Sequence, residues 1–179
     1  NLYAKFIEGD GFQNAIFDKT IINENGLTVR KLQNFVSQQV ARFGGAAVHL
    51  AFNIKGEITD ITPIPFQFCR MSYNKDSEEV DGIAIYNDWN KVKSARLKKS
   101  NITKYNFFNI SNVLEEITEV GIEEYKGQVL YFNLDDTIYP IAPIDAVIED
   151  AQTDAEIKAF KLSNIRNNFL ASHLIELPF

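Results

Sequence analysis

A helical pattern near the C-terminus constrains the fold of this chain most strongly. After Pro140 and Pro143, apolar side chains recur at steps of three and four residues, the spacing of one helix face. Acidic residues fill the first half of the pattern and basic residues the second half, an order that complements the helix dipole. Asn167 and Asn168 favour a left-handed stop after it. We therefore predict one long helix with a single apolar face made of Ile148, Ala151, Ala155, Ala159, Leu162, Ile165 and Phe169.

That apolar face permits two interpretations. If the face packs in a core, Phe169→Ala or Leu162→Ala would lower the free energy of unfolding by roughly 2 to 5 kcal/mol. If the melting temperature does not change, the face is exposed and becomes a candidate assembly surface.

A second helix is predicted in the first half of the chain. Thr28 is a suitable N-cap, and the apolar residues that follow it at helical spacing continue to Phe43. Gly44 and Gly45 end this helix.

Extended segments separated by turns predict a sheet. Pro63 and Pro65 favour a sheet edge or a bulge, and a short helix is expected from a cap at Ser111 through Glu119, with Gly121 ending it. The predicted strands span 46–52, 57–62, 66–71, 82–86, 105–109, 128–134 and 173–177. The fold class is therefore α+β, a mainly antiparallel sheet flanked by helices, with one long helix near the C-terminus.

Composition limits the classes of function. The 179 residues are 45% hydrophobic and include 14 Phe and 7 Tyr, which suffices for a packed interior. The net charge of −6 disfavours tight, non-specific DNA binding by the whole surface. Cys69 is the single cysteine, so the chain has no internal disulfide, as expected of a protein from a reducing cytoplasm. No apolar run reaches the roughly 18 to 20 residues of a membrane span.

The length predicts one domain over residues 1–179, or two small lobes that share a core. Within it we distinguish a helix-plus-strand region over 1–89, a basic loop over 90–104, and a strand, long helix and strand over 105–179. The chain starts at Asn1 rather than Met, so we expect a piece of a longer protein or a processed one.

Few side chains are candidates for catalysis. His49 and His173 are the only histidines, and no Gly-x-Ser-x-Gly turn accompanies them. Cys69 in an apolar strand indicates a small buried side chain. Asp135 and Asp136 are adjacent, point to opposite faces of a strand and favour a turn cap. No phosphate-binding motif is present. We expect no catalytic, metal-binding or cofactor-binding residues and no cofactor; a hydrolase using Asp135, Asp136 or His49 is the enzymatic alternative.

A basic run is the feature most suited to contact with nucleic acid. Residues 90–104 contain no acid and end at Lys104. A solvated loop, a salt-bridged contact between subunits and a DNA contact all fit this pattern. A positive segment on an acidic protein also suits head-to-tail association with an acidic neighbour. The candidate DNA or subunit contacts are Lys91, Lys93, Arg96, Lys98 and Lys99.

Two stretches resemble portal proteins of tailed phages. The first, residues 34–65, has a helix, a small-residue break at Gly44 and Gly45, a strand, a turn with Gly56, and a strand that closes on prolines. The second runs from Gly127 to residue 175 and has a strand, a proline turn, a long helix, an asparagine stop and a strand. Asn168 stands where portals commonly have glycine. Arg70 and the pair Asp88-Trp89 resemble portal-like proteins of Bacteroidetes prophages.

The resemblance implies a structural subunit of a dodecameric ring at one vertex of a virus head, and not an enzyme. DNA would pass through the channel of the ring, and the terminase motor and head-tail connector proteins would dock on it, with no membrane involved. The ring would assemble in the cytoplasm of the bacterial host and remain in the virion. This chain would supply part of the wing and body, without the stem and clip. The alternative in the same class is a phage tail or baseplate adaptor, or another interaction module.

Overall fold

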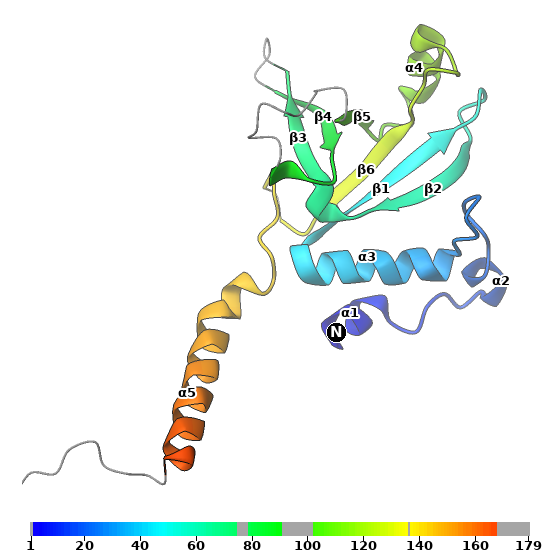
Figure 1. Ribbon diagram of the computed structural model, residues 1–179. Helices are drawn as coiled ribbons and strands as arrows, with labels where there is room; N and C mark the ends of the chain where they lie inside the picture. Colours follow the sequence, from blue (N-terminus) through cyan, green and yellow to red (C-terminus); the bar gives the residue numbers. More distant parts are fainter. Residues whose placement is uncertain (1, 75–78, 91–101, 136, 168–179) are drawn as a thin grey trace, which may run out of the picture. The chain divides into compact units, whose positions relative to one another are not determined.

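The computed structural model describes residues 2–74, 79–90, 102–135 and 137–167. These residues belong to two compact units, Asn1–Ala142 and Pro143–Phe179 (Figure 1). The interpretation of residues 1–179 as a single domain stays a prediction.

The first unit contains a six-stranded sheet in the order β2-β1-β6-β5-β4-β3. Every neighbouring pair is antiparallel except β5 and β6, which run parallel. The predicted α+β class with a mainly antiparallel sheet is therefore confirmed. The strands are β1 (Gly45–Phe52), β2 (Ile58–Ile64), β3 (Cys69–Tyr73), β4 (Val80–Ile85), β5 (Thr103–Phe107) and β6 (Gln128–Asn133).

Helix α3 (Val29–Phe43) precedes the sheet and has both of the predicted caps. The Thr28 hydroxyl accepts a hydrogen bond from the Lys31 amide at 3.4 Å. Gly44 ends the helix in the left-handed conformation with φ +75°. A Cβ at Gly44 would come within 2.7 Å of the Ile141 carbonyl oxygen, so both the conformation and the space require glycine. Gly45 is not part of the stop and starts β1 instead.

Strand β1 is covered on both faces. Its side chains alternate, and Val48, Leu50 and Phe52 point to one side, where they form a core cluster with Val113 and Ile117 of α4 (Val113–Val120). Leu32 and Val36 of α3 pack against the same cluster. The β1 strand is thus a central layer between two groups of buried side chains.

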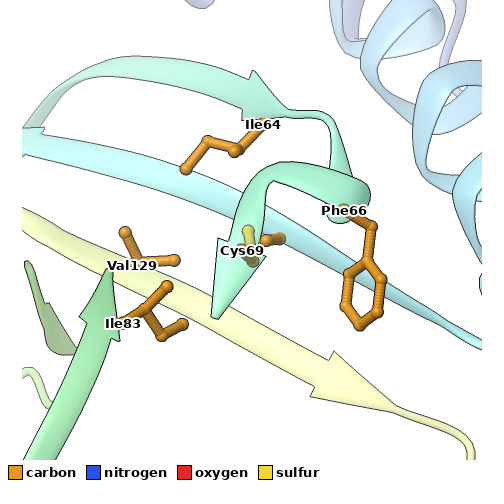
Figure 2. Close-up of a cluster of buried hydrophobic side chains, with 6 residues drawn as sticks. Ile64, Phe66, Cys69, Ile83 and Val129 are labelled. Carbon is orange, nitrogen blue, oxygen red and sulfur yellow. The ribbon is translucent and has the colours of Figure 1, made fainter. Parts of the chain in front are cut away.

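The second core cluster lies on the other face of β1 and joins both edges of the sheet. It contains Ile64 from the end of β2 and Cys69 from the start of β3, although these are the two edge strands. Figure 2 shows their side chains directed into one space with Phe66, Ile83 and Val129. The sheet must therefore curve strongly, because its outermost strands contribute to a single cluster.

The connection between β2 and β3 differs from the prediction. Pro63 lies in β2, which is an edge strand as predicted, and pairs with Val48 of β1. The predicted strand over 66–71 is wrong in its first half, because Phe66–Phe68 form a 3-10 turn, η1, and β3 begins at Cys69. The Phe68 amide donates to the Pro65 carbonyl at 2.9 Å and closes this turn.

Three further helices belong to the first unit. Helix α1 (Leu2–Glu8) lies along α3, and α2 (Ala15–Asp18) is a single turn that also contacts α3 (Figure 1). The predicted cap of α4 is wrong, since Asn112 rather than Ser111 is its N-cap residue and makes no side-chain cap bond. The predicted end of α4 at Gly121 is confirmed.

The second unit consists of a 3-10 turn, η4 (Asp145–Val147), and the long helix α5 (Ile148–Arg166). The predicted long helix is confirmed, but the interpretation of its apolar face as a core face is wrong. No described residue of α5 is buried, and Leu162 and Ile165 are 48% and 58% exposed. The described part of this unit offers only η4 as a packing partner, and one turn cannot cover a helix face. Phe169 lies outside the described residues.

Candidate functional site

His49 makes structural contacts and does not belong to a cluster of reactive groups. Its ring nitrogen Nε2 lies 2.6 Å from the Lys126 carbonyl oxygen and donates to it, since a carbonyl only accepts. The ring also lies against Tyr105, with the ring planes tilted by 60° and the centroids 4.9 Å apart. A Cβ at Gly127 would meet the Leu50 carbonyl oxygen at 2.2 Å, so glycine allows the chain to approach β1 here.

Asp135 serves as a turn cap, as predicted. Its Oδ2 accepts a hydrogen bond from the Ile141 amide at 3.0 Å. His49 pairs with Val129 near the start of β6, whereas Asp135 follows the opposite end of that strand, about 20 Å of extended chain away. The structure therefore does not bring these two hydrolase candidates together. Asp136 and His173 lie outside the described residues.

Cys69 is a buried small side chain, as predicted. It belongs to the core cluster of Figure 2 and is 4% exposed. Burial raises the pKa of its thiol to about 11, while the nearby Arg70 charge opposes that shift. The thiol is protonated at neutral pH and lacks the thiolate that a nucleophile requires.

Arg70 and Trp89, which carry part of the portal resemblance, contact each other. The guanidinium lies over the indole ring, 5.5 Å from the ring centroid. The Trp89 indole N–H donates to the Phe68 carbonyl at 2.8 Å, and Arg70 Nη1 donates to the Cys69 carbonyl at 2.7 Å. Both residues are part of the resemblance found in the sequence, but nothing in the sequence predicts that they contact each other. Together they tie the start of β3 to the segment after β4.

The candidate contact residues of the basic run, Lys91, Lys93, Arg96, Lys98 and Lys99, lie outside the described residues. Lys104, which ends the run, is described and has a partner within the chain. Its Nζ lies 2.6 Å from Asp81 Oδ2. This hydrogen bond is the main reason that the pKa of Asp81 lies below its usual range. Lys104 thus acts in a contact between β4 and β5.

A polar network around Glu116 is the arrangement that the sequence did not reveal. The fully buried Gln128 accepts from the Asn109 amide at 2.9 Å and donates to Glu116 Oε2 at 2.9 Å. Glu116 also accepts from Asn106 Nδ2 at 2.9 Å and from the Tyr125 hydroxyl at 3.1 Å. Burial and then the Glu116 charge raise the pKa of Tyr125. In the sequence, Glu116 is one of several acidic residues of a short helix, and no pattern distinguishes it from the solvent-exposed ones.

This network borders a hollow of about 270 Å³, which Glu119 and Glu124 also line. Each of the Glu116 hydrogen bonds runs to a group of the same chain, and together they join α4 to β5 and β6. The arrangement is therefore a structural clamp. Across the described ranges, no three side chains of His, Cys, Asp or Glu are grouped as metal ligands would be. No helix among the described residues is both long and apolar enough to cross a bilayer.

The strongest candidate for a functional surface is helix α5. Its large apolar side chains are exposed, from 43% for Ile148 to 67% for Phe160. Single exposed apolar residues are ordinary, but five large ones along one helix without a buried residue make α5 a candidate for contact with another molecule. We call the exposed residues Ile148, Ile157, Phe160, Leu162 and Ile165 the α5 surface.

Only part of the α5 surface belongs to the apolar face that the sequence predicts. The predicted face contains Ile148, Leu162 and Ile165 but not Ile157 and Phe160. Ile157 lies two residues after Ala155, a separation at which helix side chains point to different sides. This spacing was the feature of the sequence that could have indicated a second apolar side of the helix.

Neither a known protein family nor a curated protein sequence matches this chain.

Proposed function

We propose that this chain is a structural subunit of the portal ring of a tailed phage and has no catalytic role. The observation that carries the proposal is the α5 surface. A helix of this length is marginal in water by itself, and helices in proteins gain most of their stability by packing an apolar face. Exposed apolar residues along α5 therefore fit a subunit whose helix is covered on assembly.

The order of elements supports the portal class within this proposal. The layout behind the resemblance is a helix, a glycine break, a strand, a glycine turn and a strand with prolines. In this chain these are α3, Gly44, β1, Gly56 and β2. Strand β6, the proline segment and α5 follow in the order of the second stretch. As a portal subunit, the chain would line or brace a ring through which DNA is packaged and ejected, with terminase and connector proteins docking on it.

Negative-stain microscopy of the intact protein that contains this chain tests the proposal. Rings with a central hole and about twelvefold symmetry are the expected result. Discrete monomers or dimers at micromolar concentration would contradict it and favour the adaptor alternative, because an adaptor need not close a ring.

A further inference from the structure

The charges of the second unit are divided along its length. Residues 145–156 hold five acidic and no basic side chains: Asp145, Glu149, Asp150, Asp154 and Glu156. Residues 157–167 hold three basic and no acidic ones: Lys158, Lys161 and Arg166. An ion pair between Lys158 and Asp154 joins the two halves at their boundary. Each copy therefore offers an acidic half and a basic half to a neighbour.

The apolar residues of α5 lie on two sides of the helix. In the first half, Ala151 and Ala155 lie on one side of the helix, and both are small and exposed. In the second half, Ile157 and Phe160 lie on a nearly opposite side, and both are large and exposed. The alanine side also carries the large side chains of Ile148, Leu162 and Ile165, so it is shallow only between residues 151 and 159. The nearly opposite side protrudes at Ile157 and Phe160.

We infer that α5 packs along α5 of a second copy of this chain, in the same direction and displaced by about five to seven residues, roughly 8 to 10 Å. Ile157 and Phe160 of one copy then lie over Ala151 and Ala155 of the next copy. With the same displacement Lys161 lies beside Asp154 of the next copy. This inference rests on the proposed function and specifies the contact between ring neighbours.

The position of the charges selects the parallel direction. At about 100° per residue, Lys161 lies roughly 70° from the direction of Ile157 and Phe160. Asp154 lies roughly 80° from the direction of Ala151 and Ala155, in the opposite rotational sense. These two flanks meet on the same side of the contact when both helices run in one direction. In an antiparallel pair they would lie on opposite sides.

The use of two different faces selects an extending assembly over a closed dimer. A two-fold dimer needs a single self-complementary patch, whereas a head-to-tail contact joins two unlike patches and leaves one of each free for the next copy. Helix α5 has two unlike patches. Such contacts produce a ring when the rotation between copies closes.

Disulfide trapping in the intact protein tests this register. The double variant Ala151→Cys/Ile157→Cys places one thiol on each patch, and within one helix the two Cα atoms are about 10 Å apart, too far to be bridged. Mild oxidation should therefore give a ladder of dimers, trimers and larger species on a non-reducing gel. Each single variant should give none. Cys69 should not interfere at pH 8, because it is buried and the pKa of its thiol is about 11.

A matched control and a charge exchange make the test specific. The double variant Gln152→Cys/Ser163→Cys has equally exposed positions that lie on neither patch, and it should give no ladder. Lys161→Asp added to the trapping pair should lower the yield of trimers and larger species severalfold. Addition of Asp154→Lys should restore part of the ladder, because the pair between copies is re-created with its signs exchanged while the ion pair of Asp154 with Lys158 is lost.

The outcomes separate this inference from the proposed function. A ladder supports both. Dimers alone from the double variant would indicate a closed pair and overturn the inference. Rings in the microscope without cross-links would overturn the inference and leave the portal proposal standing. Neither rings nor cross-links would overturn both.

Discussion

Strand β1 and helix α5 are both apolar on more than one side, but the molecule treats them differently. Every second side chain of β1 faces α3 and α4, the others face the curved sheet, and most of the strand is buried. None of the described residues of α5 is buried. Apolar character alone therefore does not place an element in the core. The difference lies in the elements beside each one, because the described part of the second unit gives α5 only η4 as a neighbour.

The largest expected effect is on the β1 side of this comparison. Leu50→Ala removes a side chain that is 5% exposed and packed in the cluster with α3 and α4. We expect the free energy of unfolding to fall by about 2 to 5 kcal/mol, measured by urea denaturation. A loss below about 1 kcal/mol would mean that the cluster around β1 is not a packed core.

The polar clamp of the first unit should come next. Glu116→Ala leaves Gln128 Nε2 without its partner in a fully buried position. The expected loss of unfolding free energy is about 1 to 3 kcal/mol. Glu119→Ala, on the exposed side of the same helix, is the matched control and should change stability by less than about 0.5 kcal/mol. Equal effects of the two variants would mean that the hydrogen bonds of Glu116 do not stabilise the fold.

Alkaline pH should weaken the first unit through Cys69. The pKa of the thiol is about 11 in the fold against an ordinary 9.0, so the folded state holds its proton where the unfolded chain has lost it. Its contribution is complete below pH 9 and is lost as pH rises from 9 through 11. At pH 10 the loss is about 1 kcal/mol.

Denaturation curves at pH 8 and pH 10 measure this loss. Cys69→Ala should show a smaller fall in unfolding free energy between these two values than the unaltered chain. Identical falls would show that Cys69 is not the titrating group.

A cysteine placed on α5, as in Ala151→Cys, should react with a thiol reagent in the folded state at pH 8, and Cys69 should not.

The smallest effect is expected on α5. Leu162→Ala removes the same side chain as Leu50→Ala but at a position that is 48% exposed. In the unassembled chain the unfolding free energy should change by less than about 0.5 kcal/mol. A loss as large as that of Leu50→Ala, in monomers confirmed by light scattering, would mean that α5 has a packing partner within its own chain.

The sequence was sufficient for elements whose ends carry local signals. Thr28 and Gly44 determine the bounds of α3, and the apolar run from Ala46 to Phe52 indicated β1, because caps and turns depend on residues within a few positions. The periodicity after Pro143 likewise indicated α5. These features needed no knowledge of distant contacts.

Features that depend on distant residues were out of reach. In the sheet, β1 lies beside β6, which follows about 80 residues later, and the sequence of neither strand predicts this pairing. The Glu116 clamp and the contact of Arg70 with Trp89 arise from that order. The exposure of α5 could not be predicted from its pattern either, because a helix can have the same apolar positions whether or not its own chain covers them.

The two-sided burial of β1 has a consequence for how the chain tolerates changes in length. Deletion or insertion of one residue within Gly45–Phe52 would exchange the two sets of side chains, moving Leu50 and Phe52 toward the curved sheet and His49 toward α3 and α4. Both clusters would be lost at once. The turn over 53–56 contributes no side chain to these clusters, so a change of length there leaves the alternation of β1 intact as long as Gly56 keeps its left-handed φ of +76° beside Leu114. Variation in length among natural versions of this chain should therefore occur in the turn and spare β1.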